Sequence, residues 1–185
     1  MNKVIELLQN RASSPKLMAP APNQEELEQI LKCALRAPDH GRLKPWRFHI
    51  LQGEQLKELG ELFAEAVQKD EQPEVKVEKC RNMPQRAPMM IVASCHPFEN
   101  PKIPQQEQVL AVGAAIQNMQ IAISSLGYAS IWRTGEMAYH PHIEKAFGVP
   151  NNGQIVGFIY IGTAAAPLTA PETTTAEYVT NGIKP

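Results

Sequence analysis

The segment from Gln105 to Leu126 constrains the fold more than any other part of the chain. Its large apolar residues follow one another at alternating steps of three and four, which is the spacing of one face of an α-helix: Val109, Val112, Ile116, Met119, Ile123 and Leu126. Small residues between them, such as Gly113, would let another backbone approach closely, and Gly127 marks the helix end. We therefore expect a long central helix that also forms part of a subunit interface.

Shorter elements precede and follow this helix. Runs of apolar residues predict strands at 46–51, 89–95, 128–133 and 154–162. Because the run at 89–95 is almost entirely apolar, we expect that strand to be buried on both faces. Helical spacing predicts helices at 2–10, 23–37, 54–70 and 141–147, with a further turn at 74–82. The second helix begins with a capping box formed by Asn23 and Glu26.

The charge balance argues against several classes of protein. The chain carries 18 Lys and Arg against 19 Asp and Glu, whereas nucleic-acid binders normally show a clustered excess of basic residues. Its longest apolar runs, 88–95 and 155–161, are far shorter than the roughly 18 to 20 residues that cross a bilayer. Residues 1–20 lack the pattern of a secretory signal, and the three cysteines share no CxxC spacing. We expect a cytoplasmic protein with neither a membrane nor a nucleic-acid partner.

Most motifs of known catalytic chemistry are absent. There is no GxGxxG after a strand and no GxxxxGK[ST] loop, so neither a Rossmann dinucleotide site nor a P-loop is supported. His140 and His142 flank Pro141 without a third ligand at a suitable spacing, which favours a loop that enters a helix over a metal site. Cys95 ends an apolar strand, where a cysteine is usually a small buried hydrophobe. The sequence therefore predicts no metal site and no thiol nucleophile.

Two segments combine cations with hydrogen-bond donors. Residues 11–16, Arg-Ala-Ser-Ser-Pro-Lys, hold a guanidinium, two hydroxyls and an ammonium, a combination that suits an oxyanion. Residues 36–46 hold three cations, a histidine, two prolines and a glycine, and deliver Trp46 at the start of a strand. The alternatives are an ordinary polar loop for the first segment and a solvated connection for the second. The residues alone leave both alternatives open.

These segments and two later ones occur in an order that is similar to a known family. The chain contains Arg11-Ala12-Ser13 after a short helix, then Arg36-Ala37-Pro38-Asp39-His40 and Pro45-Trp46-Arg47-Phe48, then Ser125-Leu126-Gly127-Tyr128 followed by Ile131-Trp132-Arg133-Thr134-Gly135, and a closing strand at 155–163. This combination resembles the flavin-dependent NAD(P)H nitroreductase family, in particular its short single-domain members.

The resemblance implies an α+β fold. It implies a three-layer sandwich in which a mixed, mainly antiparallel sheet is flanked by helices, in a homodimer that binds FMN at the subunit interface. Residues 1–166 would form a single FMN-binding domain. Residues 167–185 hold too few apolar residues to pack alone, and would lie on the partner subunit and complete its sheet.

The resemblance also assigns site residues. They are Arg11, Ala12 and Ser13 at the FMN phosphate, Arg36 and His40 on the loop that reaches the flavin across the dimer, Trp132, Arg133 and Thr134 beside the isoalloxazine ring, and Ala122, Ile123, Ser124, Ser125, Leu126 and Gly127 for NADH or NADPH. The last turn of a helix is a sufficient alternative role for that final stretch. Gly135 would allow close approach of the backbone. Two positions depart from the family pattern, because Ala12 replaces an arginine and Pro15 replaces a commonly basic residue.

The implied chemistry needs no catalytic side chain and no metal, because the flavin carries the electrons. We expect NADH or NADPH to give a hydride to FMN, and a nitroaromatic, a quinone or a similar electron-poor acceptor to take it in a second, ping-pong half-reaction. Arg11 and Lys16 are expected to place positive charge near flavin N1 and O2. The alternatives are the same flavin fold with dehydrogenation, dehalogenation or flavin fragmentation, or a non-catalytic flavin-binding dimer.

Overall fold

A computed structural model describes residues 2–183 of the chain. Its elements in chain order are α1 (Lys3–Asn10), β1 (Leu17–Met18), α2 (Gln24–Ala34), η1 (His40–Arg42), β2 (Trp46–Gln52), α3 (Glu54–Lys69), α4 (Glu74–Arg81), η2 (Pro84–Arg86), β3 (Met89–Cys95), α5 (Gln105–Ser125), β4 (Ala129–Arg133), η3 (Glu136–Tyr139), α6 (Pro141–Ala146) and β5 (Gln154–Ala164). The sequence predicted a domain at 1–166 and an extension at 167–185. Of these residues, Met1, Lys184 and Pro185 lie outside the part that the structure describes.

The strands form one sheet with β5 at its centre. β5 pairs with β3 along one edge and with β4 and β1 along the other, and β2 lies beyond β3. Every pairing in residues 2–183 is antiparallel, whereas the resemblance implied a mixed sheet. β4 ends at Arg133 opposite Phe158, so the stretch of β5 before Phe158 has no backbone partner from β4. The candidate site forms where β4 ends.

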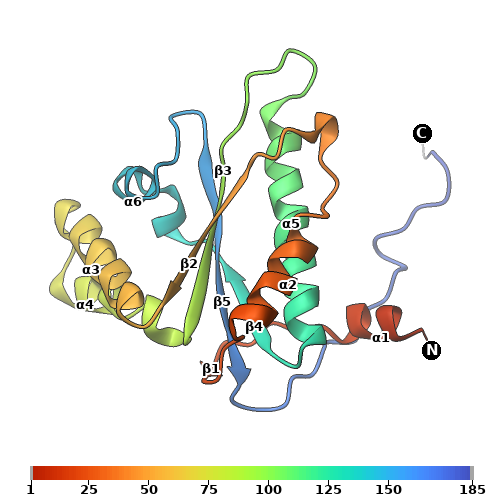
Figure 1. The fold of residues 1–185 in the computed structure, drawn as a ribbon, viewed down its shortest axis with the longest axis horizontal. Coiled ribbons are helices and arrows are strands. Elements are labelled where there is room, and N and C mark those ends of the chain that lie inside the picture. Colours follow the sequence, from red (N-terminus) through yellow and green to blue (C-terminus); the bar gives the residue numbers. More distant parts are fainter. Residues whose placement is uncertain (1, 184–185) are drawn as a thin grey trace.

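Helices cover both faces of the sheet, as Figure 1 shows. α2 and α5 lie on one face, and α3, α4 and α6 lie on the other. Side chains of β5 alternate between the two layers: Ile159 packs in the core under α2 and α5, whereas Phe158 and Tyr160 pack in the core under α3 and α4. The predicted three-layer α+β sandwich is therefore confirmed.

The long helix is central, as its stripe predicted. α5 runs from Gln105 to Ser125, and Val112, Ile116, Met119 and Ile123 on its stripe are fully buried. The β3 strand at its predicted bounds is buried at every position, because helices cover both of its faces. The participation of α5 in a subunit interface stays a prediction.

Two terminal segments have little contact with the core of the single chain. α1 buries none of its residues, and its apolar Val4, Ile5 and Leu8 are exposed. Residues 165–183 form no helix or strand, and Tyr178 and Val179 within them are exposed. Figure 1 shows this tail leading away from the sheet beyond α1. Its packing on a partner subunit stays a prediction.

No helix within residues 2–183 has both the length and the apolar character that a bilayer span needs.

Candidate functional site

A cavity lies at the end of β4, on the face of the sheet that carries α3 and α4. Its volume is about 650 Å³, and its walls come from four separate parts of the chain: Phe63, Met83, Arg86, Trp132, Arg133, Thr134, Gly135, Glu136, Met137, Phe158 and Tyr160. Residues 132–136 are exposed to solvent, so the cavity opens to the surface. The predicted ring-binding residues Trp132, Arg133 and Thr134 are brought together here.

Trp132 is fixed across the end of β5. Its indole Nε1 donates a hydrogen bond of 3.1 Å to the backbone oxygen of Val156. A Cβ atom at Gly157 would overlap the indole, and one at Gly113 of α5 would lie 3.7 Å from it. The absence of a side chain at Gly157 therefore lets the indole lie against the strand on the face that α5 covers, because Trp132 is opposite Ile159 of the core under α2 and α5.

Gly135 forms the turn that leaves β4 beside the cavity. Its φ angle is +70°, a backbone conformation that residues with a side chain rarely adopt. A Cβ atom there would meet nothing within 4 Å. The glycine is therefore required by the backbone conformation, and the space above it is open to a ligand.

One end of the cavity is positively charged. Arg86 in η2 and Arg133 at the end of β4 form no ion pair in the part of the chain that the structure describes. Tyr160 is 4% exposed and lines the same cavity. Burial raises the pKa of its hydroxyl, and the positive charges of Arg86 and Arg133 oppose that rise. Both arginines are therefore close enough to influence the Tyr160 hydroxyl.

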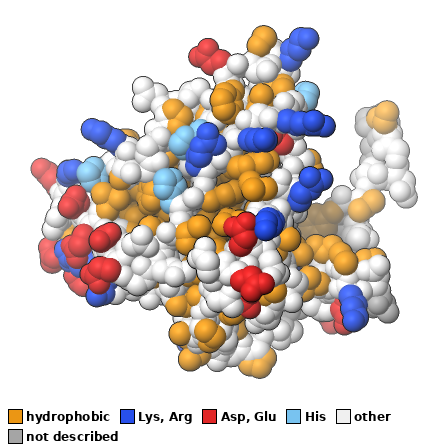
Figure 2. Space-filling model, viewed as in Figure 1, with side chains coloured by type: hydrophobic (Ala, Val, Ile, Leu, Met, Phe, Trp, Pro, Cys, Tyr) orange, Lys and Arg blue, Asp and Glu red, His pale blue; other side chains and the backbone are white. Residues whose placement is uncertain are grey.

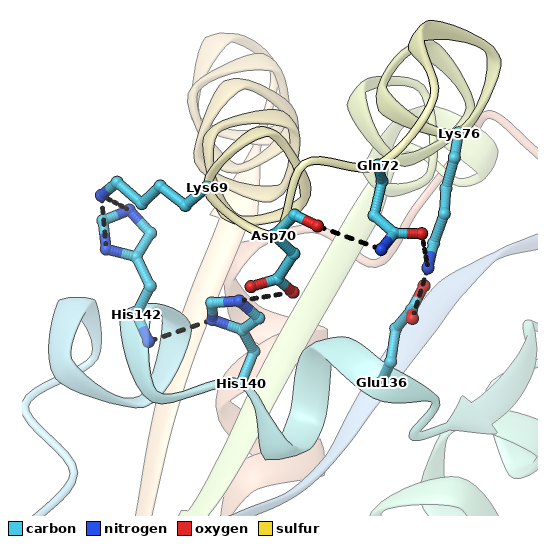
Figure 3. Close-up of polar contacts among 7 residues, drawn as sticks. All are labelled: Lys69, Asp70, Gln72, Lys76, Glu136, His140 and His142. Atoms are coloured by element: carbon cyan, nitrogen blue, oxygen red, sulfur yellow. Dashed lines mark hydrogen bonds and ion pairs between the residues drawn. The ribbon is translucent and has the colours of Figure 1, made fainter.

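The acidic residue of the cavity is already engaged. Glu136 accepts a hydrogen bond of 2.8 Å from Lys76 of α4, and Lys76 also donates to Gln72. Figure 3 shows this contact beside the histidine pair. His140 accepts a hydrogen bond at Nδ1 from the backbone N–H of His142 and lies 3.3 Å from Asp70 through Nε2. The pair caps α6 and ties it to α3, which confirms the predicted helix-entry loop.

The predicted phosphate segment lies next to β4. The backbone N–H of Ser14 donates to the oxygen of Ser130 over 3.1 Å, and the Ser14 hydroxyl donates to the oxygen of Lys16. The bond to Ser130 joins the residue after Ser13 to β4, two positions before Trp132 along that strand. Arg11 is half-buried and forms no ion pair with any described residue. The sequence thus predicted two segments that the fold makes neighbours.

Arg36 and His40 lie elsewhere in the single chain. Arg36 lines a second hollow of about 430 Å³ with Arg42, Lys44 and Trp46. His40 Nδ1 lies 2.7 Å from a carboxylate oxygen of Glu107 in the first turn of α5. Neither residue lines the cavity at β4. A role at the flavin thus requires a second copy of the chain, as the resemblance implied.

The stretch predicted for NADH or NADPH forms the C-terminal turn of α5. Ala122 and Ile123 are buried in the core, and the Ser125 hydroxyl donates to the backbone oxygen of Ala122. Leu126 packs against the same core, and Ser124 is half-buried. Gly127 has a φ angle of +84° and ends the helix. Helix termination accounts for these positions, and nicotinamide binding there stays a prediction.

Sequence reasoning missed several cavity residues, among them Phe63, Arg86 and Tyr160. They sit in a helix, a short turn and the closing strand, and only the tertiary fold brings them together.

Comparison with known proteins decides the family. The model of the nitroreductase family matches residues 8–163. The chain belongs to the nitroreductase family. YdjA of Escherichia coli strain K12, named as an NAD(P)H nitroreductase, is 37% identical over 176 residues, which are 92% of this chain and 95% of YdjA. A Haemophilus influenzae protein also named as an NAD(P)H nitroreductase is 38% identical over 159 residues, covering 85% of this chain and 86% of its own.

Solved structures share the nitroreductase fold. A nitroreductase-like family protein from Bacillus cereus superposes with a TM-score of 0.84 at 23% identity, over 98% of this chain and 96% of its own. A nitroreductase with bound FMN from Desulfitobacterium hafniense superposes with a TM-score of 0.69 at 21% identity, over 99% of this chain and 100% of its own. These similarities extend over nearly the whole chain, so the fold is that of the family.

Proposed function

We propose that this nitroreductase-family protein is an FMN-dependent oxidoreductase. It takes a hydride from NADH or NADPH and passes it to a nitroaromatic, a quinone or a similar electron-poor acceptor. One observation carries this proposal: a cavity that includes Arg133 and Thr134 opens at the end of β4, and β4 is also bonded, through Ser130, to Ser14 of the segment that contains Arg11. YdjA, which is named as an NAD(P)H nitroreductase, supports the same activity.

The residues at this edge fit both parts of FMN. A Cβ atom at Gly135 would meet nothing within 4 Å, so the turn after β4 leaves room for a flat ring, and the Arg133 guanidinium and the Thr134 hydroxyl suit its carbonyl oxygens. The guanidinium of Arg11 suits the phosphate, because it forms no ion pair within residues 2–183 and its fork matches phosphate oxygens. When bound, FMN supplies the two-electron transfer that the side chains of this site do not offer.

The chain's own residues bind FMN and orient its ring. Arg11, Ala12 and Ser13 hold the phosphate, while Trp132, Arg133 and Thr134 support the ring along β4. The open side of the cavity admits the nicotinamide and then the acceptor, so the two substrates use one site in turn. This sharing predicts ping-pong kinetics.

A second copy of the chain completes the site. Arg36 and His40 lie on an exposed loop away from their own cavity, and Glu107 holds the His40 ring in place. The exposed apolar residues of α1, such as Val4 and Leu8, and the exposed tail offer surfaces for a homodimer. In that homodimer the 36–40 loop of each subunit reaches the flavin of the other.

An anaerobic titration tests the proposed function. The purified protein is loaded with FMN, and its visible absorbance is followed while NADH or NADPH and then a nitroaromatic are added. We expect the flavin absorbance to bleach with the nicotinamide and to return with the acceptor. Protein that binds no FMN at micromolar concentrations contradicts the proposal. Bound flavin that neither nicotinamide reduces identifies a non-catalytic flavin-binding dimer instead.

A further inference from the structure

The part of the cavity against α3 and β5 has features that the proposed flavin contacts do not use. Phe63 of α3 and Phe158 of β5 line it, and their rings meet edge to face with centroids 5.4 Å apart. Both side chains belong to the buried core under α3 and α4, so their positions are fixed. Met83 and Met137 line the same cavity. A molecule that enters here therefore meets an apolar and partly aromatic surface.

Tyr160 presents a free hydroxyl to this surface. It follows Phe158 by two positions on β5, so both side chains point to the same face of the sheet. Only 4% of Tyr160 is exposed, and its hydroxyl makes no hydrogen bond with a described residue. No described residue keeps a fully buried polar atom without a partner, so this hydroxyl reaches the open space of the cavity. A polar group in so buried a side chain normally has a partner, which a ligand would supply here.

Two guanidinium groups lie near the same hydroxyl. The positive charges of Arg86 and Arg133 both oppose the rise in the pKa of Tyr160, which requires that they lie close to it. Neither arginine forms an ion pair with any described residue. Glu136, the acidic residue of the lining, is already compensated by Lys76 over 2.8 Å (Figure 3). The cavity therefore holds two uncompensated positive charges beside one free hydroxyl.

An aromatic acid matches this combination of groups. Guanidinium and phenol groups both donate to a carboxylate, and such charge-assisted bonds are roughly twice as strong as neutral ones. The ring of the acid can lie against Phe63 and Phe158, where contacts between aromatic rings are favourable. A small inorganic anion would leave the apolar surface unused, and a neutral aromatic molecule would leave the charges uncompensated.

We propose that the cavity contains a binding site for an aromatic carboxylate. Arg86 and Tyr160 hold the carboxylate, and Arg133 adds its positive charge. The ring lies against Phe63 and Phe158. The main anchor, Arg86, is not among the residues proposed to hold FMN. Binding of the acid needs no electron transfer, so this inference stands apart from the proposed function.

Isothermal titration calorimetry with benzoate as the probe tests the inference. The full-length protein is titrated before and after loading with FMN, with benzamide as the neutral analogue and inorganic phosphate as the anion without a ring. The variants are Arg86→Gln, Arg86→Lys and Tyr160→Phe. Arg81→Gln is the matched control, because Arg81 pairs with Glu61 and Glu78 and does not line the cavity. Circular dichroism checks the fold of each variant.

We expect wild type to bind benzoate at a single site, and to bind benzamide and phosphate about tenfold more weakly. Arg86→Gln is expected to weaken benzoate binding about tenfold and Tyr160→Phe about threefold, because each removes a donor to the carboxylate. Arg86→Lys keeps the charge and is expected to recover part of the loss. Arg81→Gln and the FMN-loaded wild type are expected to bind benzoate as the unloaded wild type does.

Four results would overturn the inference. They are no saturable binding of benzoate, equal affinity for benzoate and either analogue, unchanged affinity in both Arg86→Gln and Tyr160→Phe, and loss of benzoate binding when FMN is loaded. The last result would give this part of the cavity to the flavin. Wild type that binds benzoate but no FMN contradicts the proposed function alone, so the two failures are distinguishable.

Discussion

The surface of α3 and α4 differs from the edge of β4 in whether its cationic side chains form ion pairs. Three cations on the helices have carboxylate partners: Arg81 pairs with Glu61 and Glu78, Lys57 with Glu54, and Lys76 with Glu136. Figure 2 shows acidic and basic side chains side by side at this end of the molecule. At the edge of β4, Arg11, Arg86 and Arg133 have no such partners among the described residues.

This difference distinguishes charges that are neutralised within the chain from charges that a ligand can bind. Exposed ion pairs contribute little to stability, and they leave no charge free for a ligand. Guanidinium groups that form no ion pair with a described residue keep their charge available to a bound anion. A chain of net charge −1 thus has a locally positive site without a basic surface.

The largest expected effect concerns the unpaired side of this comparison. Arg11→Ala is expected to weaken FMN binding by about 1.5 to 3 kcal/mol, because it deletes a charge-assisted contact with the phosphate. Fluorescence titration of the apoprotein measures the affinity, and thermal unfolding without FMN is expected to match wild type. Unchanged FMN affinity would remove Arg11 from the site.

Gly157→Ala is expected to displace the indole of Trp132, the residue next to Arg133. The new Cβ atom overlaps the indole of Trp132, so the ring must move and the fold loses about 1 to 3 kcal/mol. Urea unfolding measures the loss. In a Trp132→Leu background the same substitution is expected to cost clearly less, and an equal cost in both backgrounds would contradict the assigned contact.

Arg81→Ala tests the paired side. It removes the partner of Glu61 and Glu78, and a small decrease in melting temperature is expected, because the pairs are exposed. FMN affinity and reduction potential are expected to stay at wild-type values. A weaker flavin affinity here would show that the two regions are not separate.

The smallest expected effect is a change of folding stability with pH, caused by two histidines that do not line the cavity. Burial lowers the pKa of His49 and His96 from 6.5, so between the folded and unfolded pKa values the unfolded chain binds more protons. Their contribution to stability is complete above about pH 6.5 and falls as the pH drops toward the lower, folded values. Unfolding measured from pH 7.5 to 5.5 is expected to show this decline, and His49→Gln with His96→Gln to reduce it. FMN affinity is expected to be unaffected by the double substitution, and a change would link these histidines to the site.

Local pattern predicted the elements well. The stripe on α5, the buried β3 and the capping box at Asn23 all appear where the sequence indicated them. β1 was missed, because its two residues carry no periodicity and are held only by pairing with Thr163 and Ala164 far along the chain. The alternation of helices and strands did not fix the pairing of β5 with β3, β4 and β1, which depends on contacts distant in sequence.

The site was predictable only in part. Arg11 lies in a segment whose composition suits an oxyanion, and the resemblance to the family assigned both Arg11 and Trp132 to the flavin site, which stays a prediction. Arg86, Phe63 and Tyr160 were not found, because each looks ordinary within its own element and gains its role from residues distant in sequence. Charge pairing is likewise invisible in the sequence, since Arg81 and Arg86 differ in environment and not in type.

The cavity's division between distant segments has a consequence for how such enzymes diversify. Phe63 and Met83 form a wall that is separate in the chain from the residues proposed to hold the phosphate. Replacing those two side chains alters the room left for an incoming oxidant and spares the anchoring groups. Acceptor preference and prosthetic-group retention are thereby free to evolve as independent traits.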